Sequence, residues 1–211
     1  MIEAFIALAM QSAPAAPRPR IVFEEPALAA PIAGEIEAVL IAPLFRQPFF
    51  CSEHHDGQMP HVGDALGTDC MVVGGIDEKG LGFSRLYRTD GRTNADWYGW
   101  GAEVLAPFDG IVTGLFPNAR VNEPGVQGRP PAGMMTIRRD DGTTVMLGHV
   151  ADVAAAVGDR VRSGQAIARV GNNGPARAPH IHIGAYRGRV PLQIRWDQRA
   201  MARLRRERPA K

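Results

Sequence analysis

Glycine and proline recur along the whole chain and limit the length of any regular element. The 211 residues include 24 glycines and 17 prolines. Because proline lacks a backbone donor and glycine favours turns, this spacing disfavours a helical bundle and favours short strands. Residues 107–110 and 140–142 read as turns, the second as a hairpin. We therefore expect a domain built mainly from β-strands.

The alternation of apolar and polar residues predicts where these strands lie. Expected strands cover residues 69–74, 82–87, 103–106, 110–115, 134–139, 143–150, 166–170 and 180–186. Residues 118–131 are expected to form an exposed loop, and no long helical period occurs before the C-terminal tail. The predicted fold class is mainly β: an antiparallel, barrel-sandwich-like sheet with long loops and a short basic C-terminal helix or tail.

Changes in composition divide the chain into four parts. Residues 1–20 form a leader in which a short apolar stretch precedes small residues, as in a signal peptide, although Glu3 interrupts it and no basic residue comes first. Residues 21–50 are a lead-in segment, residues 51–197 the main domain, and residues 198–211 a basic tail. Export to the periplasm or cell envelope is expected. No stretch is long enough to span a bilayer.

Charge and aromatic content limit the classes of molecule that the chain is expected to bind. The net charge is +2, and the positive charge is concentrated in the tail. Aromatic residues make up only 7% of the chain, and no array of them is available to stack on bases. We therefore expect no nucleic acid partner, and the tail is interpreted as a solvated terminal helix or frayed end.

The two cysteines, Cys51 and Cys70, flank a cluster of histidines. In an exported protein they could form a disulfide that closes this loop. As free thiols they could instead be small buried side chains. A zinc site made from both is disfavoured, because neither belongs to a Cys-x-x-Cys pair.

All six histidines occur in three places: His54, His55 and His61 early, His149 in the middle, and His180 with His182 late. On an extended strand, side chains two residues apart point to the same face. His180 and His182 should therefore point outward together while Ile181 faces the core. Two imidazoles on one face suit a metal site or acid–base chemistry, although such a pair alone is weak evidence.

Several blocks of sequence together resemble the M23 (LytM/lysostaphin-like) zinc metallopeptidases. They are residues 101–112, residues 141–150, and residues 157–174 followed by 178–183. The blocks follow the order of that family and cover roughly residues 60–190. The resemblance implies a LytM-type β-domain. One block, 157–165, also occurs in lipoyl- and biotin-carrier folds, but the chain lacks a lysine in the setting that such a carrier modifies.

The resemblance also implies a role for each matching residue. His182 and Asp69 would bind one Zn²⁺ per chain, while His149 and His180 would activate the water at the metal. A catalytic zinc needs three nitrogen or oxygen ligands and an open position, which is consistent with this set. The chain lacks the His-Glu-x-x-His pattern, so histidine is the natural proton acceptor.

The sequence departs from the family pattern at the first zinc ligand. The family usually places a histidine four residues before the aspartate, where this chain has Ala65. Some divergent members place this histidine further upstream, and the long segment 74–99 also resembles that subgroup. We predict His61 as the replacement ligand, ahead of His55 and His54.

The leading functional hypothesis is a zinc metalloendopeptidase that cuts peptides of peptidoglycan in the cell envelope. The alternative is a catalytically inactive LytM-like domain that binds or activates a cell-wall partner, such as an envelope regulator. Ala65 favours the alternative, whereas the retained His149, His180 and His182 favour the enzyme.

Overall fold

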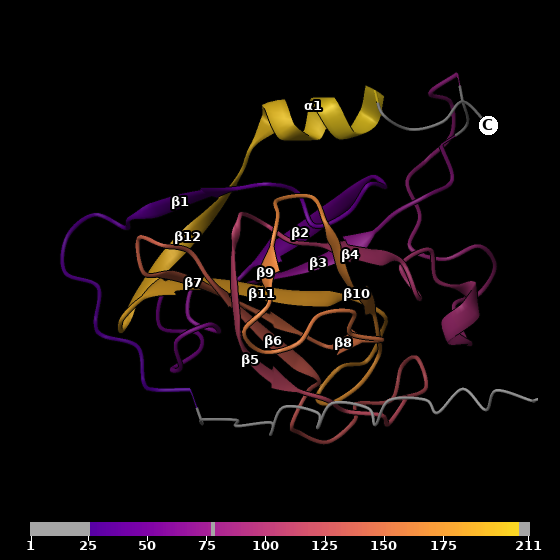
Figure 1. Ribbon diagram of the computed structural model, residues 1–211. Coiled ribbons are helices and arrows are strands. Elements are labelled where there is room, and N and C mark those ends of the chain that lie inside the picture. The colour runs from indigo at the N-terminus through magenta and orange to yellow at the C-terminus, as the bar shows by residue number, and fades with distance from the viewer. Residues whose placement is uncertain (1–25, 77–78, 207–211) are drawn as a thin grey trace, which may run out of the picture.

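The chain folds into a strongly curved β-sheet with a short helix at its C-terminal end (Figure 1). The computed structural model describes residues 26–76 and 79–206. The expected leader (residues 1–20) and residues 207–211 of the expected tail lie outside the described residues. The elements are β1 (Ala38–Ile41), β2 (Phe49–Glu53), β3 (Thr68–Val72), the 3₁₀-helix η1 (Asn94–Asp96), β4 (Glu103–Leu105), β5 (Gly110–Phe116), β6 (Met134–Arg138), β7 (Thr143–Gly148), β8 (Val150–Ala151), β9 (Arg160–Val161), β10 (Ala166–Val170), β11 (Ile181–Arg187), β12 (Val190–Trp196) and α1 (Gln198–Arg206).

Most strands belong to one sheet whose path runs β1-β12-β11-β7-β6-β5-β9. A second sheet contains β4, β10 and β8. Among the described strands, β1 and β12 pair in parallel and the other pairs are antiparallel. The predicted mainly β, antiparallel fold class is therefore confirmed, with one parallel pair that was not expected.

Strand β11 organises the sheet because three strands pair with it. Along one edge it pairs with β7. Its other edge is divided: residues 185–187 pair with β12, and residues 181–183 pair with β3. In turn, β2 pairs with β3. The N-terminal half of β11 is thereby flanked by β7 on one edge and, on the other, by β3, which lies more than a hundred residues earlier in the sequence than β11.

The core lies on one face of the main sheet, between that sheet and the smaller one. Ile183 of β11 and Leu147 of β7 are fully buried in one apolar cluster with Val104 of β4 and Ile167 of β10. Because side chains alternate along a strand, the intervening residues of β7 and β11 point to the opposite face. That opposite face carries the histidines of the strand.

The sequence prediction of the strands was incomplete, since β1, β2, β9 and β12 were not predicted. Residues 82–87 were predicted as a strand but form only isolated bridges, with Gly74 paired to Arg85 and Tyr87 to Trp97. Strand β12 was not predicted, and it contains Pro191. The proline is tolerated because β11 pairs with this end of β12 on one side, while β1 pairs only from Gln193 onward on the other.

Both chain ends that were set apart in the sequence contribute to the structure. The expected lead-in segment supplies β1 and the start of β2. The expected basic tail begins as α1, where the Asp197 carboxylate accepts hydrogen bonds from the backbone N–H groups of Arg199 and Ala200. This is the usual capping arrangement at a helix start. Among the described helices, none has the length and apolar character that crossing a membrane requires.

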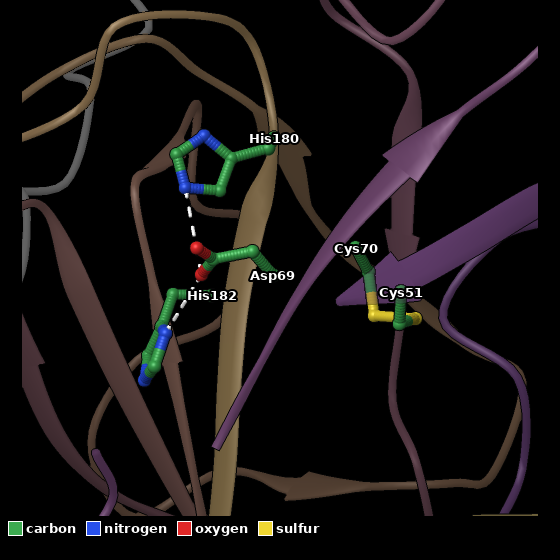
Figure 2. The surroundings of a disulfide bond; sticks show 5 residues. All are labelled: Cys51, Asp69, Cys70, His180 and His182. Carbon is green, nitrogen blue, oxygen red and sulfur yellow. Dashed lines mark hydrogen bonds and ion pairs between the residues drawn. A yellow bond between two sulfur atoms is a disulfide. The ribbon is translucent and has the colours of Figure 1, made fainter. Parts of the chain in front are cut away.

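Cys51 and Cys70 form a disulfide, which confirms the first of the two cysteine interpretations. The two residues are direct partners in the β2–β3 ladder. Of the described strands, β2 pairs with β3 alone, so the disulfide fixes a strand that would otherwise be held by one ladder of hydrogen bonds. Figure 2 shows the disulfide beside β3, away from the side chain of the adjacent Asp69.

The disulfide should therefore contribute measurably to stability. We expect the double variant Cys51→Ala/Cys70→Ala to lose about 3 kcal/mol of unfolding free energy, because the cross-link restricts the unfolded chain. Urea unfolding of the oxidised protein and the variant measures the difference. Reduced wild-type protein should match the variant, and equal midpoints for the oxidised protein and the variant would contradict the prediction.

Candidate metal centre

An open cleft of about 690 Å³ lies on the face of the sheet opposite the core. It is lined by the histidines at positions 54, 61, 149, 180 and 182, and by Asp64 and Asp69. A second cleft, of about 590 Å³, covers the neighbouring part of β5, β6 and β7. Met134 and Met146 line both clefts, so the two hollows adjoin.

The pairing of β3 with β11 places a carboxylate directly opposite an imidazole. Asp69 and His182 are partners in this ladder, and Asp69 Oδ1 lies 2.9 Å from His182 Nδ1. On the other side of His182, its partner in β7 is Gly148. A Cβ at Gly148 would approach the His182 Cβ to 3.2 Å, so the glycine leaves room for the imidazole.

His54 reaches the same carboxylate from the end of β2. Its backbone N–H donates to the Gly67 carbonyl at 2.8 Å, which continues the β2–β3 pairing by one step. Its Nε2 atom lies 3.7 Å from Asp69 Oδ2, and its ring stacks on His182 with centroids 5.2 Å apart. Ligand atoms of His54, Asp69 and His182 all lie within 4.8 Å of one another.

The structure brings His54, and not the predicted His61, into this group. His61 lines the cleft, and its backbone forms an isolated bridge with Leu28. His55 is exposed and its Nδ1 contacts the carbonyl of Asp56. A signal for His54 was present in the sequence, since pairing Cys51 with Cys70 in an antiparallel ladder brings residues 52–54 beside Asp69.

The other predicted residues lie next to this group. His180 Nε2 is 3.7 Å from Asp69 Oδ1, and Figure 2 shows the carboxylate between the rings of His180 and His182. The His149 ring packs against the His180 ring with centroids 4.4 Å apart. His149 has a φ of 63°, a left-handed conformation that is uncommon outside glycine and often marks functional sites.

Four of the five imidazoles that line the cleft have one nitrogen held by a backbone carbonyl. The contacts are His54 Nδ1 with Asp64 O at 3.2 Å, His149 Nδ1 with Asn173 O at 2.7 Å, His180 Nδ1 with Ala178 O at 2.8 Å, and His182 Nε2 with Gly63 O at 3.0 Å. A carbonyl only accepts, so the nitrogen that faces it must carry the proton. The remaining nitrogen of each neutral ring is therefore a lone-pair donor, and for His54 and His182 it faces Asp69.

The ionisable side chains of the cleft lie in two electrostatic environments, one that favours the charged form and one that favours the neutral form. Burial alone would raise the pKa of Asp69, but the hydrogen bond from His182 and the neighbouring imidazoles lower it to about 2. Burial opposes a charge on His182, yet hydrogen bonds to the carboxylates of Asp64 and Asp69 raise its pKa to about 10. Burial lowers the pKa of His149 to about 3 and also lowers that of His180.

The donor set fits a zinc ion. Two imidazoles and a carboxylate are ligand types that zinc binds, and one ligand atom from each of the three side chains lies within 4.8 Å of the others. The Asp69 oxygen and the His182 Nδ1 lone pair repel each other unless a proton or a cation lies between them. A proton on His182 Nδ1 removes this repulsion, which contributes to the raised pKa of His182.

Comparison with known proteins finds one family whose sequence model matches part of this chain. The sequence model of Peptidase family M23 matches residues 96–194, a segment that contains His149, His180 and His182. No curated protein matches the chain.

Solved structures with a similar arrangement include three M23 proteins. A mutant catalytic domain of the prophage-encoded M23 protein EnpA from Enterococcus faecalis is 20% identical, with a TM-score of 0.44, and the match covers 70% of this chain and 87% of that one. For the catalytic domain of the antimicrobial peptidase lysostaphin from Staphylococcus simulans the values are 17%, 0.40, 65% and 79%. For pseudoalterin, a deep-sea M23 metalloprotease, they are 13%, 0.45, 73% and 74%. Through residues 96–194, the chain is similar to peptidase family M23.

Proposed function

We propose that the chain is a zinc metalloendopeptidase that hydrolyses peptide bonds of peptidoglycan in the cleft. The proposed ligands are His54, Asp69 and His182, and the proposed proton-transfer residues are His149 and His180. The observation that carries this proposal is the convergence of three ligand atoms within 4.8 Å, next to two further histidines whose low pKa keeps them neutral.

His54 replaces His61 in the proposal on geometric grounds. Its ring is fixed by the Asp64 carbonyl so that Nε2 faces Asp69, as a metal ligand requires. The ion would supply Lewis acidity, lowering the pKa of water and polarising the carbonyl of the scissile bond.

The chain's own residues would move the protons of the reaction. His149 and His180 each donate Nδ1–H to a carbonyl, which leaves the Nε2 lone pair free to accept a proton. Because burial keeps both rings neutral near pH 7, either can take a proton from the attacking water. The same nitrogen would then return the proton to the departing amine.

The substrate class and location rest on further features. The cleft is open and adjoins a second hollow, which suits an extended peptide rather than a compact small molecule. A peptide of peptidoglycan is the substrate class of the family that the sequence resembles. The Cys51–Cys70 disulfide supports an exported location, because disulfides persist mainly in oxidising compartments.

The second candidate function is a domain that has lost catalysis and binds an envelope partner. Ala65, at the position of the usual first ligand, is the observation that favours it. The two functions differ in metal content, since only the enzyme requires an ion in the cleft.

Metal analysis of single variants tests the proposed ligands. We expect about one zinc per chain in the wild-type protein, and loss of zinc in His54→Ala, Asp69→Ala and His182→Ala. His61→Ala and the exposed His55→Ala are matched controls from the same segment and should keep the metal. Zinc retained by His54→Ala but lost by His61→Ala would restore the original ligand assignment, and a metal-free wild-type protein would favour the binding domain.

Variants at the proposed proton-transfer residues should separate catalysis from metal binding. We expect His149→Ala and His180→Ala to keep zinc and to lose at least about 100-fold in turnover, the usual contribution of a positioned acid or base. Release of soluble peptides from purified peptidoglycan measures the activity. Full activity in both variants would exclude the proposed roles.

Zinc binding should displace a proton from His182. Because the pKa of His182 is raised to about 10 in the metal-free protein, the ring is protonated at pH 8 and must lose this proton to bind a metal. Apparent affinity should therefore rise about tenfold per pH unit below this pKa. Calorimetry at pH 8 in buffers of different ionisation enthalpy counts the protons. Binding enthalpy that does not depend on the buffer would contradict the expectation.

A further inference from the structure

The loop formed by residues 61–67, here called the 61–67 loop, contacts both proposed histidine ligands at the ring nitrogen that points away from Asp69. The Asp64 carboxylate oxygen Oδ1 lies 3.2 Å from His182 Nε2, and the Gly63 carbonyl lies 3.0 Å from the same nitrogen. The Asp64 carbonyl accepts from His54 Nδ1 at 3.2 Å. A single residue, Asp64, thus faces the outer nitrogen of both rings.

Close packing fixes this loop against the sheet. The Asp64 carbonyl also accepts from the Gly67 N–H at 2.9 Å, and Ala65 N–H donates to the His61 carbonyl at 2.8 Å. A Cβ at Gly67 would lie 2.8 Å from both Asp64 O and His182 Cε1. A Cβ at Gly184 of β11 would overlap the Gly63 carbonyl. The glycines therefore allow the loop to approach the His182 ring.

The orientation of the contacts suits support of a metal ligand. The Nε2–H of His182 points to the loop, so its Nδ1 lone pair is directed at Asp69, where the ion would lie. A carboxylate on the outer N–H of a ligand fixes the ring and makes the inner nitrogen a stronger donor. Asp64 is partly buried, with a side chain 27% exposed, which limits competition from water.

We propose that Asp64 is a positioning residue for the metal centre, orienting His182 through its carboxylate and His54 through its carbonyl. This inference rests on the proposed function, because it requires the ion at His54, Asp69 and His182. In this chain, the 61–67 loop contains Ala65 where the related sequences have a ligand, and it supports two ligands instead of supplying one.

A purely structural role for Asp64 predicts a different effect of its removal on stability and on metal affinity. If the carboxylate only stabilised the loop, its removal would lower the unfolding free energy of the metal-free protein and leave the metal affinity of the folded protein unchanged. If it orients His182, affinity falls in a protein that is still folded. Zinc affinity and metal-free stability must therefore be measured on the same variants.

The experiment compares Asp64→Ala, Asp64→Asn and Asp56→Ala in the full chain. Asp56 is an exposed aspartate in the same early segment and serves as the matched control. Competition of zinc with a chromophoric chelator gives the affinity, and the visible spectrum of Co²⁺-substituted protein reports the ligand geometry. We expect about 10- to 100-fold weaker zinc binding for Asp64→Ala and a smaller loss for Asp64→Asn, whose amide oxygen can still accept from Nε2–H. Asp56→Ala should match the wild type.

The outcomes separate this inference from the proposed function. Wild-type zinc affinity in either folded Asp64 variant would overturn the positioning role, while zinc bound by the wild type would leave the proposed function intact. A wild-type chain that binds no zinc would remove the proposed function itself. If Asp64→Ala does not fold, Asp64→Asn decides alone: it keeps the size of the side chain and removes the charge.

Discussion

The pairing of β3 with β11 is the constraint on which the rest of the cleft depends. It sets Asp69 directly opposite His182, and every other proposed functional group is arranged around that pair. Strand β11 is able to accept β3 because β12 occupies only the other half of the same edge. The disulfide then holds β2 on β3, and β2 delivers His54. A β-ladder can place side chains this closely because its register, once set, fixes every residue along both strands.

Two buried histidines of the cleft have opposite pKa shifts because their neighbours differ. His182 is buried with two carboxylates nearby, so the cationic form is favoured and its pKa rises. His149 is buried against His180 and a carbonyl, without a carboxylate in direct contact, and its pKa falls. The cleft thus contains carboxylates that attract a cation at His182 and, beside them, the neutral rings of His149 and His180. The proposed hydrolysis would use both environments.

In the proposed metal centre, the first histidine comes from a different position than the family pattern predicts. His54, which directly follows β2, reaches the Asp69 carboxylate, and the 61–67 loop contacts the nitrogens of His54 and His182 that point away from this carboxylate. The loop can do so because glycines at positions 67 and 184 leave space for its carbonyls. The similarity to family M23 lies in residues 96–194, whereas His54 and the 61–67 loop lie before that segment. The departure from the family pattern at Ala65 therefore lies outside the segment that matches the family model.

The sequence by itself determined the features that depend on local pattern. Turn residues indicated a mainly β fold, and strand alternation placed His180 and His182 on one face with Ile181 in the core. Only the tertiary structure decided which early histidine meets Asp69, that β12 joins the sheet despite Pro191, and that Asp64 faces His182. The contacts of Asp69 and Asp64 with His182 join residues far apart in the chain, with a sequence separation of 113 between Asp69 and His182. Their register depends on the packing of whole strands, so local propensity carries no information about it.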